Sequence, residues 1–448
     1  MRPQQAPFLP QPHLSVQKLD IADYYILLLT ASFWQVGADI MRKDNDVSDK
    51  VRRHQAITGG ENLSSSIWAN LPDDLHARVV AQLPIPSIIQ KRAVCQNWNR
   101  MILSQSFKCL HQRVSSKEKP WLFMCSSFNC RENCCAYDPN LNVWHTIPLT
   151  FIPSYMRFPL VAAGGLLFIK GMPPDSTNQG TGSSSRLAVC NPITRTWRVL
   201  PPMIRGRVNS LIGVFEHSDA VNFTVVIAGG TSVCGGDYEC TTEVYDSLSN
   251  SWCVTGVVPR EYTVKITVWT SKTVYCRGML YCLTSARPYN IMAYDMKSGL
   301  WEEVKIPQPE VLFCSFLVQR RDRLLLVGGA RCEEARQRVH IWELQDDGKS
   351  YSSKKYWVEI ERIPLYLFQR FCKGKADFDL KCAGSGDMLY FFKDSHTDIL
   401  LCDLSQNPTA WNWLPMCPLS AQYSKFSIRG LLVEPGLDGV ASMQNGMP

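Results

Sequence analysis

A short pattern that recurs through the second half of the chain restricts the folds open to it. Four segments align without gaps, and in each an Asp or Asn stands six residues before a Trp. Two degenerate copies follow, so that successive tryptophans lie 49 to 56 residues apart. A unit of about 50 residues is typical of repeat folds in which each unit buries its faces against its neighbours. The four clear copies are AYDPNLNVW (136–144), VCNPITRTW (189–197), VYDSLSNSW (244–252) and AYDMKSGLW (293–301), and the degenerate ones end at Trp357 and Trp411.

Each copy has the parts of a four-stranded blade. An apolar run precedes the Asp–Trp segment by a loop of variable length, and Gly, Pro, Asn and Asp turns separate the runs. The pattern predicts strand, turn, strand, variable loop, strand, short turn, strand, which is one propeller blade. Asp is expected to cap the last turn and Trp to pack between blades. The repeat-signature residues are Asp138, Trp144, Asn191, Trp197, Asp246, Trp252, Asp295, Trp301, Trp357 and Trp411.

The two ends of the repeat region predict how the ring closes. The first copy has no innermost strand before Trp121, whereas FSIRGLLVEP (426–435) is a spare strand near the C-terminus. We therefore predict that this strand completes the first blade of a six-bladed, all-β propeller over residues 118–436. Residues 437–448 are expected to form a flexible tail.

Residues 66–110 have the pattern of short helices. Pro72 suits a first helical position, and Asp73 and Asp74 follow where negative charge favours the helix dipole. Leu75, Val79 and Leu83 form one apolar stripe, and two further helical runs follow Pro84 and Pro86. Three short helices cannot bury all this apolar surface internally, so the remaining apolar face indicates a partner.

These two regions together resemble a known family. The helical region, with Leu71-Pro72-x-x-Leu75, Arg92-x-Val94-Cys95-x-x-Trp98 and Phe107, resembles an F-box. The Asp–Trp units resemble kelch repeats, whose period is about 50 residues. Their combination resembles the plant F-box/kelch-repeat proteins of the group that includes unusual floral organs and leaf curling responsiveness.

The resemblance implies a substrate receptor of an SCF-type cullin-RING ubiquitin ligase, without a catalytic site of its own. Its F-box, placed at 61–112, would dock on a Skp-family adaptor and, through it, on cullin and RING subunits. By analogy with the family, the adaptor contacts would come from Leu71, Pro72, Leu75, Val79, Leu83, Pro84, Ile88, Val94, Cys95 and Trp98. The alternative for each of them, Val94 and Trp98 especially, is that it holds the helices together.

The loops between second and third strands are the expected binding site for the target protein. Consecutive strands run antiparallel, so these loops all open on one face, and function sits preferentially on loops held by a rigid scaffold. For the Gly/Ser/Pro-rich first loop, 171–185, the composition favours a flexible linker over a recognition surface. The predicted loops are 171–186, 231–240, 284–290, 330–338 and 393–397.

Composition and the N-terminal region bear on the compartment. The 448 residues include 18 cysteines, but the N-terminal stretch lacks the basic flank and cleavage pattern of an export signal. Its apolar run, 24–36, is too short to span a bilayer. We therefore expect an intracellular protein, nuclear or cytoplasmic, with reduced thiols. Residues 1–60 are expected to be a weakly ordered leader.

Other chemistry is disfavoured by the sequence. The net charge of +7 is spread along the chain, which predicts neither nucleic-acid nor membrane binding. The cluster Cys125, Cys130, Cys134 and Cys135 lacks the paired spacing of a zinc site, and no catalytic motif is present, so no metal or cofactor is expected. Two alternatives to the ligase receptor stay open: a non-degradative scaffold or transcriptional co-regulator, and a propeller enzyme or ligand sensor.

Overall fold

The computed structural model divides the chain into two compact units, residues 1–116 and 117–448. The leader predicted at 1–60 lies outside the described residues. The structure describes residues 71–114, 119–126, 130–172, 185–217, 222–233, 236–266, 273–285, 287–307, 312–331, 337–346, 355–371, 380–393, 398–419 and 427–438.

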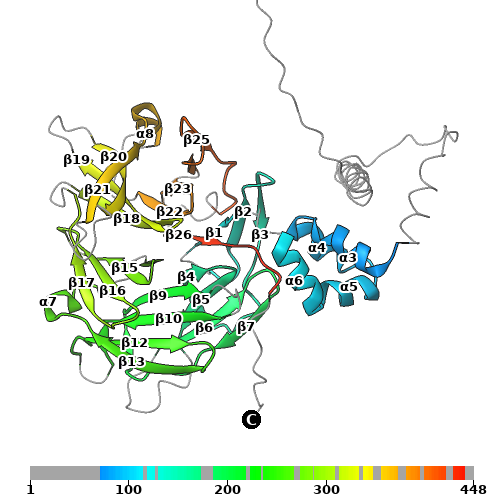
Figure 1. The fold of residues 1–448 in the computed structure, drawn as a ribbon, viewed down its shortest axis with the longest axis horizontal. Helices are drawn as coiled ribbons and strands as arrows, with labels where there is room; N and C mark the ends of the chain where they lie inside the picture. Colours follow the sequence, from blue (N-terminus) through cyan, green and yellow to red (C-terminus); the bar gives the residue numbers. More distant parts are fainter. Residues whose placement is uncertain are drawn as a thin grey trace, which may run out of the picture. The chain divides into compact units, whose positions relative to one another are not determined.

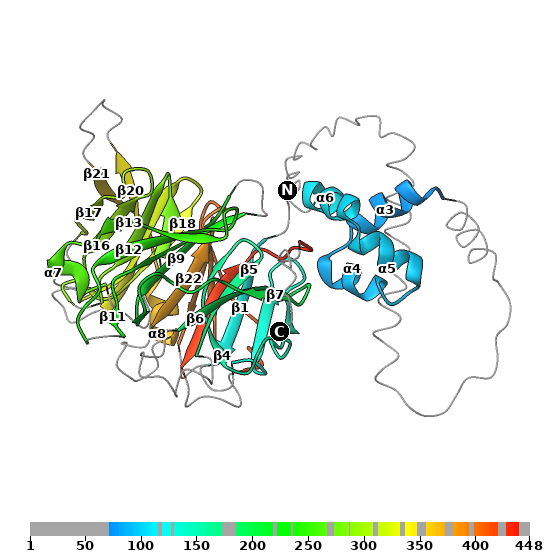
Figure 2. The same cartoon turned by 90° about the horizontal axis from the view of Figure 1, so that it is seen from below.

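The described part of the first unit is a group of four short helices (Figures 1 and 2). Sequence analysis predicted three. The additional helix follows Ser104, whose extended backbone ends the preceding helix and whose hydroxyl accepts the Phe107 N–H at 3.2 Å. Such a hydroxyl satisfies one of the free amides of a helix start. The helices are α3 (Asp73–Ala81), α4 (Ile85–Lys91), α5 (Gln96–Leu103) and α6 (Gln105–Val114).

A small apolar core holds these helices together. Helix α3 packs on α6, α6 on α5, and α5 on α4. Each helix contributes only one to three buried side chains. Much of the apolar surface therefore stays outside the core. The buried apolar residues are Val79, Val80, Ala81, Ile85, Ile88, Ile102 and Phe107.

The second unit consists of six four-stranded antiparallel sheets that form the blades of a propeller (Figure 1). The fold class predicted from the repeats is confirmed. From the innermost strand outward, blade 1 contains β26 (Ile428–Val433), β1 (Trp121–Ser126), β2 (Cys134–Asp138) and β3 (Val143–Thr146). Blade 2 contains β4 (Met156–Ala163), β5 (Leu166–Gly171), β6 (Arg186–Asn191) and β7 (Thr196–Val199). Blade 3 contains β9 (Leu211–Glu216), β10 (Phe223–Ala228), β12 (Thr241–Asp246) and β13 (Ser251–Val257).

The remaining blades follow the same order. Blade 4 contains β14 (Thr273–Cys276), β15 (Met279–Leu283), β16 (Ile291–Asp295) and β17 (Trp301–Val304). Blade 5 contains β18 (Leu312–Arg320), β19 (Arg323–Arg331), β20 (Gln337–Asp346) and β21 (Lys355–Arg362). Blade 6 contains β22 (Lys381–Ser385), β23 (Met388–Phe392), β24 (Leu400–Asp403) and β25 (Ala410–Trp413). The six innermost strands contact one another in the cyclic order β26, β4, β9, β14, β18, β22, which closes the ring.

Blade 1 combines strands from both ends of the repeat region. Strand β26 pairs antiparallel with β1 over its whole length, from Trp121 opposite Val433 to Ser126 opposite Ile428. In Figure 1, β26 (red) lies beside β1. The chain then continues to Asp438 along blade 2, where Glu434 donates its N–H to the Gly164 carbonyl at 2.8 Å.

The inner strands are buried on both faces because neighbouring blades cover them. Strands β1, β2, β10 and β23 have every residue buried, whereas the outermost strands β3 and β13 have no buried residue. Burial on both faces explains why these runs are continuously apolar rather than alternating. No helix in the described part of the chain is long and apolar enough to cross a membrane.

The propeller has two faces of different construction. Strand alternation places the turns from first to second and from third to fourth strands on one side, here called the turn face. The opposite side, the loop face, carries the second-to-third loops and the connections between blades. Four short elements lie in these loop-face segments: β8 (Arg207–Val208), β11 (Thr231–Ser232), α7 (Arg260–Thr263) and α8 (Leu365–Phe371).

Candidate adaptor and target surfaces

The ten residues predicted to contact an adaptor divide into two groups by burial. Val79 and Ile88 are 3% and 0% exposed and pack inside the helical unit. They shape the surface from beneath and present no atoms to a partner. The other eight reach the surface: Pro72, Val94 and Cys95 are exposed, and Leu71, Leu75, Leu83, Pro84 and Trp98 are half-buried.

Val94 is the most exposed large apolar residue of the helical unit. Its side chain is 59% exposed, in the short connection between α4 and α5. Arg92 fixes this connection by donating from Nε to the Asn99 Oδ1 at 3.0 Å. Leu103, which sequence analysis did not select, is 47% exposed at the end of α5. Exposed aliphatic side chains on a small, ordered unit are typical of a docking surface.

The Asp or Asn of each repeat caps the turn between the third and fourth strands. Asp138 Oδ1 accepts the N–H groups of Asn140 and Leu141 at 2.8 and 3.2 Å, and Asn191 Oδ1 accepts those of Ile193 and Thr194 at 2.8 and 3.0 Å. Equivalent caps form at Asp246, Asp295 and, in the eroded sixth copy, Asp403. These side chains therefore stabilise the turns, as the repeat pattern predicted.

Several repeat tryptophans form a hydrogen bond to the preceding blade. The indole Nε1 of Trp252 donates to the Pro201 carbonyl of blade 2 at 2.9 Å, and that of Trp357 to the Lys305 carbonyl of blade 4 at 2.8 Å. In both cases the accepting residue lies four positions after the tryptophan of the preceding copy. Trp301 donates instead to the Thr242 hydroxyl of blade 3, at 2.9 Å. The signature thus encodes how the blades are joined.

Asn191 has a second role that its aspartate counterparts lack. Its Nδ2 donates to the carbonyl oxygens of Gly436 and Asp438, at 3.1 and 2.7 Å. A carboxylate in this position has no hydrogen to donate. The departure from Asp in this copy therefore ties the segment after β26 to blade 2.

A fully buried ion pair organises part of the loop face. Arg207 and Glu243 are both 0% exposed, and the guanidinium donates to the carboxylate. Arg207 also donates to the carbonyls of Gly229 and Thr241, and Glu243 accepts the N–H groups of Ile204 and Arg205. One pair thus fixes the blade 2–3 connection against the second-to-third loop of blade 3.

The segments held in this way form a surface that we call the loop platform: residues 204–208, 229–233, 236–241 and 259–266. Strand β8 pairs with β11, and Ile266 packs against Gly229. Three of these four segments, 204–208, 236–241 and 259–266, each present one large apolar side chain that is about half exposed. They are Ile204 at 52%, Tyr238 at 51% and Val264 at 51%. Apolar side chains on a fixed backbone are suited to protein recognition, because little ordering entropy is lost on binding.

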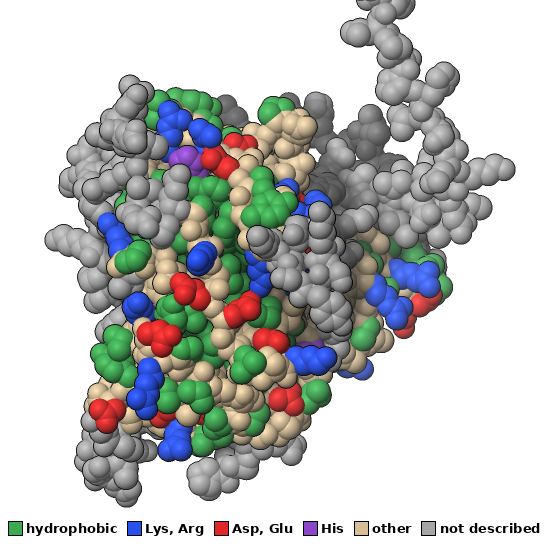
Figure 3. All heavy atoms as spheres, turned by 60° about the vertical axis from the view of Figure 1, so that its left-hand side comes forward, with side chains coloured by type: hydrophobic (Ala, Val, Ile, Leu, Met, Phe, Trp, Pro, Cys, Tyr) green, Lys and Arg blue, Asp and Glu red, His purple; other side chains and the backbone are tan. Residues whose placement is uncertain are grey.

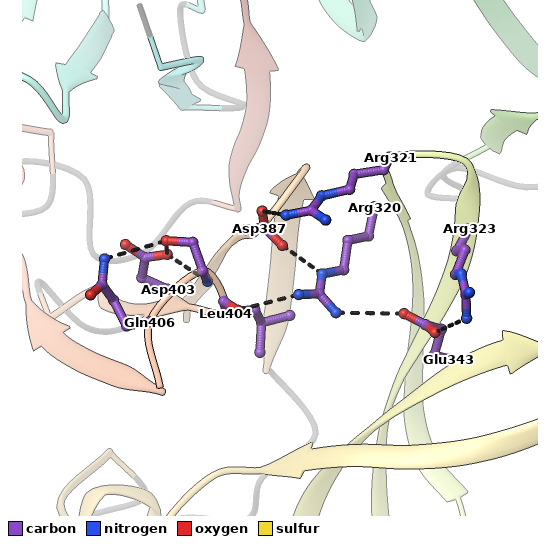
Figure 4. A network of polar contacts seen from close by, with 9 residues as sticks. Arg320, Arg321, Arg323, Glu343, Asp387, Asp403, Leu404 and Gln406 are labelled. Carbon is purple, nitrogen blue, oxygen red and sulfur yellow. Dashed lines mark hydrogen bonds and ion pairs between the residues drawn. The ribbon is translucent and has the colours of Figure 1, made fainter. Parts of the chain in front are cut away.

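The turn face carries a self-contained polar network (Figure 4). Arg320 lies between Asp387, at 2.6 Å, and Glu343, at 3.5 Å, and Arg323 reaches the other side of Glu343 at 2.6 Å. Burial raises the pKa of the Asp387 carboxyl, but Arg320 and Arg321 outweigh that effect and hold the pKa below its usual value. The network joins the arginines and Glu343 of blade 5 to Asp387 of blade 6, so it connects these two blades.

Charged side chains of both signs are mixed on one face of the molecule. On the face shown in Figure 3, basic and acidic side chains are interspersed, with hydrophobic groups between them. In the described part of the chain, no group of three or more His, Cys, Asp or Glu side chains is arranged to hold a metal ion.

The described residues combine a small helical unit that carries exposed apolar side chains with a six-bladed propeller. Residues 68–110 match the F-box domain, and residues 176–411 match the F-box associated beta propeller domain. The chain therefore belongs to the F-box proteins that carry an F-box associated β-propeller.

Individual relatives agree with this assignment and with the resemblance seen in the sequence. F-box only protein 6 of Arabidopsis thaliana is 31% identical over 329 residues, which are 72% of this chain and 64% of that protein. The chain thus spans slightly less than two thirds of that relative. An F-box/kelch-repeat protein of Arabidopsis thaliana is 28% identical over 82% of this chain and 89% of its own length. Protein UNUSUAL FLORAL ORGANS of the same plant is 25% identical over 81% and 82%.

Proposed function

We propose that this chain is the substrate-recognition subunit of an SCF-type cullin-RING ubiquitin ligase. The observation that carries the proposal is the exposure of apolar side chains on the F-box unit, above all Val94 at 59% and Leu103 at 47%. A water-facing Val and Leu gain free energy only when a partner covers them. The partner of this surface is a Skp-family adaptor, which links the chain to cullin and RING subunits. The chain itself contributes no catalytic step.

The eight surface-reaching residues of the predicted adaptor set provide the contacts in this proposal. A stable interface buries roughly 1,600 Å² in total, and a few well-packed anchors supply most of its energy. Val79 and Ile88 support those anchors by holding α3 and α4 in place.

Isolation of the complex from cells tests the proposal. The tagged full-length chain is expected to co-purify with the adaptor, cullin and RING subunits. The double substitution Leu71→Ala, Pro72→Ala is expected to lose all three together while the propeller stays folded. Recovery of a folded chain without the adaptor would contradict the proposal.

Target capture is proposed for the loop face. The loop platform supports this placement because its buried Arg207–Glu243 pair stabilises loops that belong to no blade sheet. The attraction within a buried ion pair is largely offset by the desolvation of its two charges, so the pair adds little net stability. It does hold the residues around it in one geometry. The predicted loop 171–186 lies mostly outside the described residues, as do parts of the other four predicted loops.

Matched surface substitutions test this placement. Tyr238→Ala and Ile204→Ala are expected to reduce cross-linking to captured proteins, whereas Leu300→Ala, 69% exposed on the turn face, leaves it unchanged. Deleting residues 172–184 tests the first loop in the same assay. Equal capture by all variants would show that the loop face is not the binding site for the target. Stabilisation of captured proteins by proteasome inhibition separates a degradative receptor from a scaffold or co-regulator.

A further inference from the structure

Two cysteine thiols meet where the first and last blades join. Cys135 lies on β2 of blade 1, and Cys417 follows β25 of blade 6, 282 positions later. Their Sγ atoms are 3.7 Å apart, and the side chains are 1% and 2% exposed. No disulfide joins them in the structure.

This junction, here called the ring seam, is where the chain closes the propeller. Besides the thiol contact, it contains the β26–β1 pairing and the hydrogen bond from Trp144 Nε1 to the Pro415 carbonyl at 2.9 Å. Cys135 and Cys417 belong to one apolar cluster that includes side chains of both blades. All of these contacts are noncovalent, so a bond between the two sulfurs would be the one covalent link across the seam other than the chain itself.

We propose that Cys135 and Cys417 form an oxidative modification site at which a peroxide converts the two thiols into a disulfide that locks the propeller ring. One thiolate attacks a peroxide oxygen and becomes a sulfenic acid, releasing hydroxide, which takes up the thiol's proton to form water. The second thiol sulfur then attacks the sulfenic sulfur, and its proton leaves with the hydroxyl group as water. Two thiols and one hydrogen peroxide yield one disulfide and two waters.

The geometry requires a small adjustment. A disulfide bond is about 2.05 Å long, so the two sulfurs must approach by roughly 1.7 Å from their present contact. Cys417 lies in a connection between blades rather than in a sheet, so this movement leaves the strand hydrogen bonds intact.

Burial sets the pace of the reaction. The hydrogen bond with Cys417 and the loss of water both raise the pKa of Cys135, which lowers its thiolate fraction. Both thiols are almost fully buried, so peroxide is expected to reach them only when the seam opens. The rate is expected to rise with peroxide concentration and then level off at the rate of opening.

Two other sets of cysteines provide the comparison. Cys125 and Cys134 are direct cross-strand neighbours in blade 1 and could compete as a disulfide pair. Cys190 on β6 is as deeply buried, and burial alone raises the pKa of its thiol. It serves as the matched control, since its substitution leaves the seam intact.

The test treats the reduced full-length chain with hydrogen peroxide, blocks the remaining thiols and maps disulfide-linked peptides by mass spectrometry. The expected result is a linkage of Cys135 to Cys417, reversed by dithiothreitol, with slower unfolding of the oxidised chain. Cys417→Ala should abolish the linkage and the slowing, and Cys190→Ser should keep both. Cys135→Ala gives a second, independent loss.

Several results would overturn the proposal. They are a Cys125–Cys134 linkage in its place, oxidation of these thiols to sulfinic acid without a linkage, or no modification of the native chain. A linkage that appears only after denaturation would overturn it too.

Discussion

The indole of Trp144 and the carbonyl of Pro415, 271 positions apart, meet at 2.9 Å and join the first blade to the last. The same bond, with the same spacing of its acceptor, joins Trp252 to Pro201 within the ring. The ring seam is therefore built with the same contact as two junctions inside the ring, those made by Trp252 and Trp357. This equivalence allows the seam to be compared with an ordinary blade junction.

Trp144→Phe should weaken the seam. The side chain stays aromatic, but the indole N–H that donates to Pro415 is lost. We therefore expect the free energy of unfolding, measured by denaturant titration, to fall by about 1–2 kcal/mol. Trp252→Phe removes the same bond between blades 2 and 3 and should cost a similar amount. If Trp144→Phe left the unfolding free energy unchanged while Trp252→Phe lowered it, the seam bond would be dispensable.

Asn191→Asp should loosen the segment that follows β26. The new carboxylate still caps its own turn, but it places an oxygen where Asn191 has its Nδ2 donor. In the original chain this donor lies 3.1 and 2.7 Å from the carbonyl oxygens of Gly436 and Asp438. We expect a cost of about 1–3 kcal/mol at pH 7, because two acceptors lose their partner. The cost should shrink toward pH 4, where protonation restores one donor.

The matched control for this change is Asp246→Asn. It exchanges the same two residue types at the same repeat position, where the turn amides of Leu248 and Ser249 are the partners. A small effect there, with a large one for Asn191→Asp in thermal unfolding, is expected. Equal effects would mean that the C-terminal segment contributes nothing through Asn191.

Removing either member of the buried pair should be costly. Arg207→Met leaves the Glu243 carboxylate without its counter-charge in a site closed to water, and such losses amount to about 3–5 kcal/mol. Arg323→Met is the control, because Arg323 is about half exposed beside Glu343 and its removal should cost less than about 1 kcal/mol. Hydrogen exchange should show that the loss is concentrated in 229–241. A loss below 1 kcal/mol for Arg207→Met would refute a structural role for the pair.

His111 should make the F-box unit sensitive to mild acid. Burial lowers the pKa of this histidine below 6.5, and its Nε2 has no hydrogen-bond partner within the described residues. Between the lowered pKa and 6.5 the unfolded chain binds more protons than the folded one, so stability falls as pH falls through this window. His111→Phe removes the effect.

Hydrogen exchange of peptides from 73–114 provides the measurement. The ratio of exchange rates between the original chain and His111→Phe, compared at each pH, should grow from pH 7.5 to pH 5.5. A ratio that does not change with pH would show that His111 has the same pKa in the folded and in the unfolded chain.

The parts of the fold that could be predicted are those whose geometry is local. The cap at Asp138 and the fixed distance to Trp144 belong to one hairpin, so the same spacing recurs and reveals the blades. The four-helix form of the F-box unit was not predicted, because Ser104 gives no sequence break as clear as a proline. Core packing was left open as an alternative for every residue of the adaptor set, and the pattern could not show that Val79 and Ile88 are the buried ones, since an apolar stripe does not say which neighbour covers it.

Long-range pairings were harder to predict for a different reason. Arg207 and Glu243 are separated by 36 positions, and Cys135 and Cys417 by 282, so no local spacing connects them. Asn191 was visible as a departure from Asp, yet its partners became apparent only when the ring closed. These residues became recognisable as pairs through the blade order rather than through any motif.

The most direct test of the central claim is the affinity of the full-length chain for a purified Skp-family adaptor. We predict measurable binding, weakened at least tenfold by Val94→Asp, which places a charge on the exposed apolar surface of the F-box unit. Leu248→Asp, 69% exposed on the propeller, adds the same charge and should leave the affinity unchanged. Absence of binding by the original chain, or equal affinities for the two variants, would contradict the account.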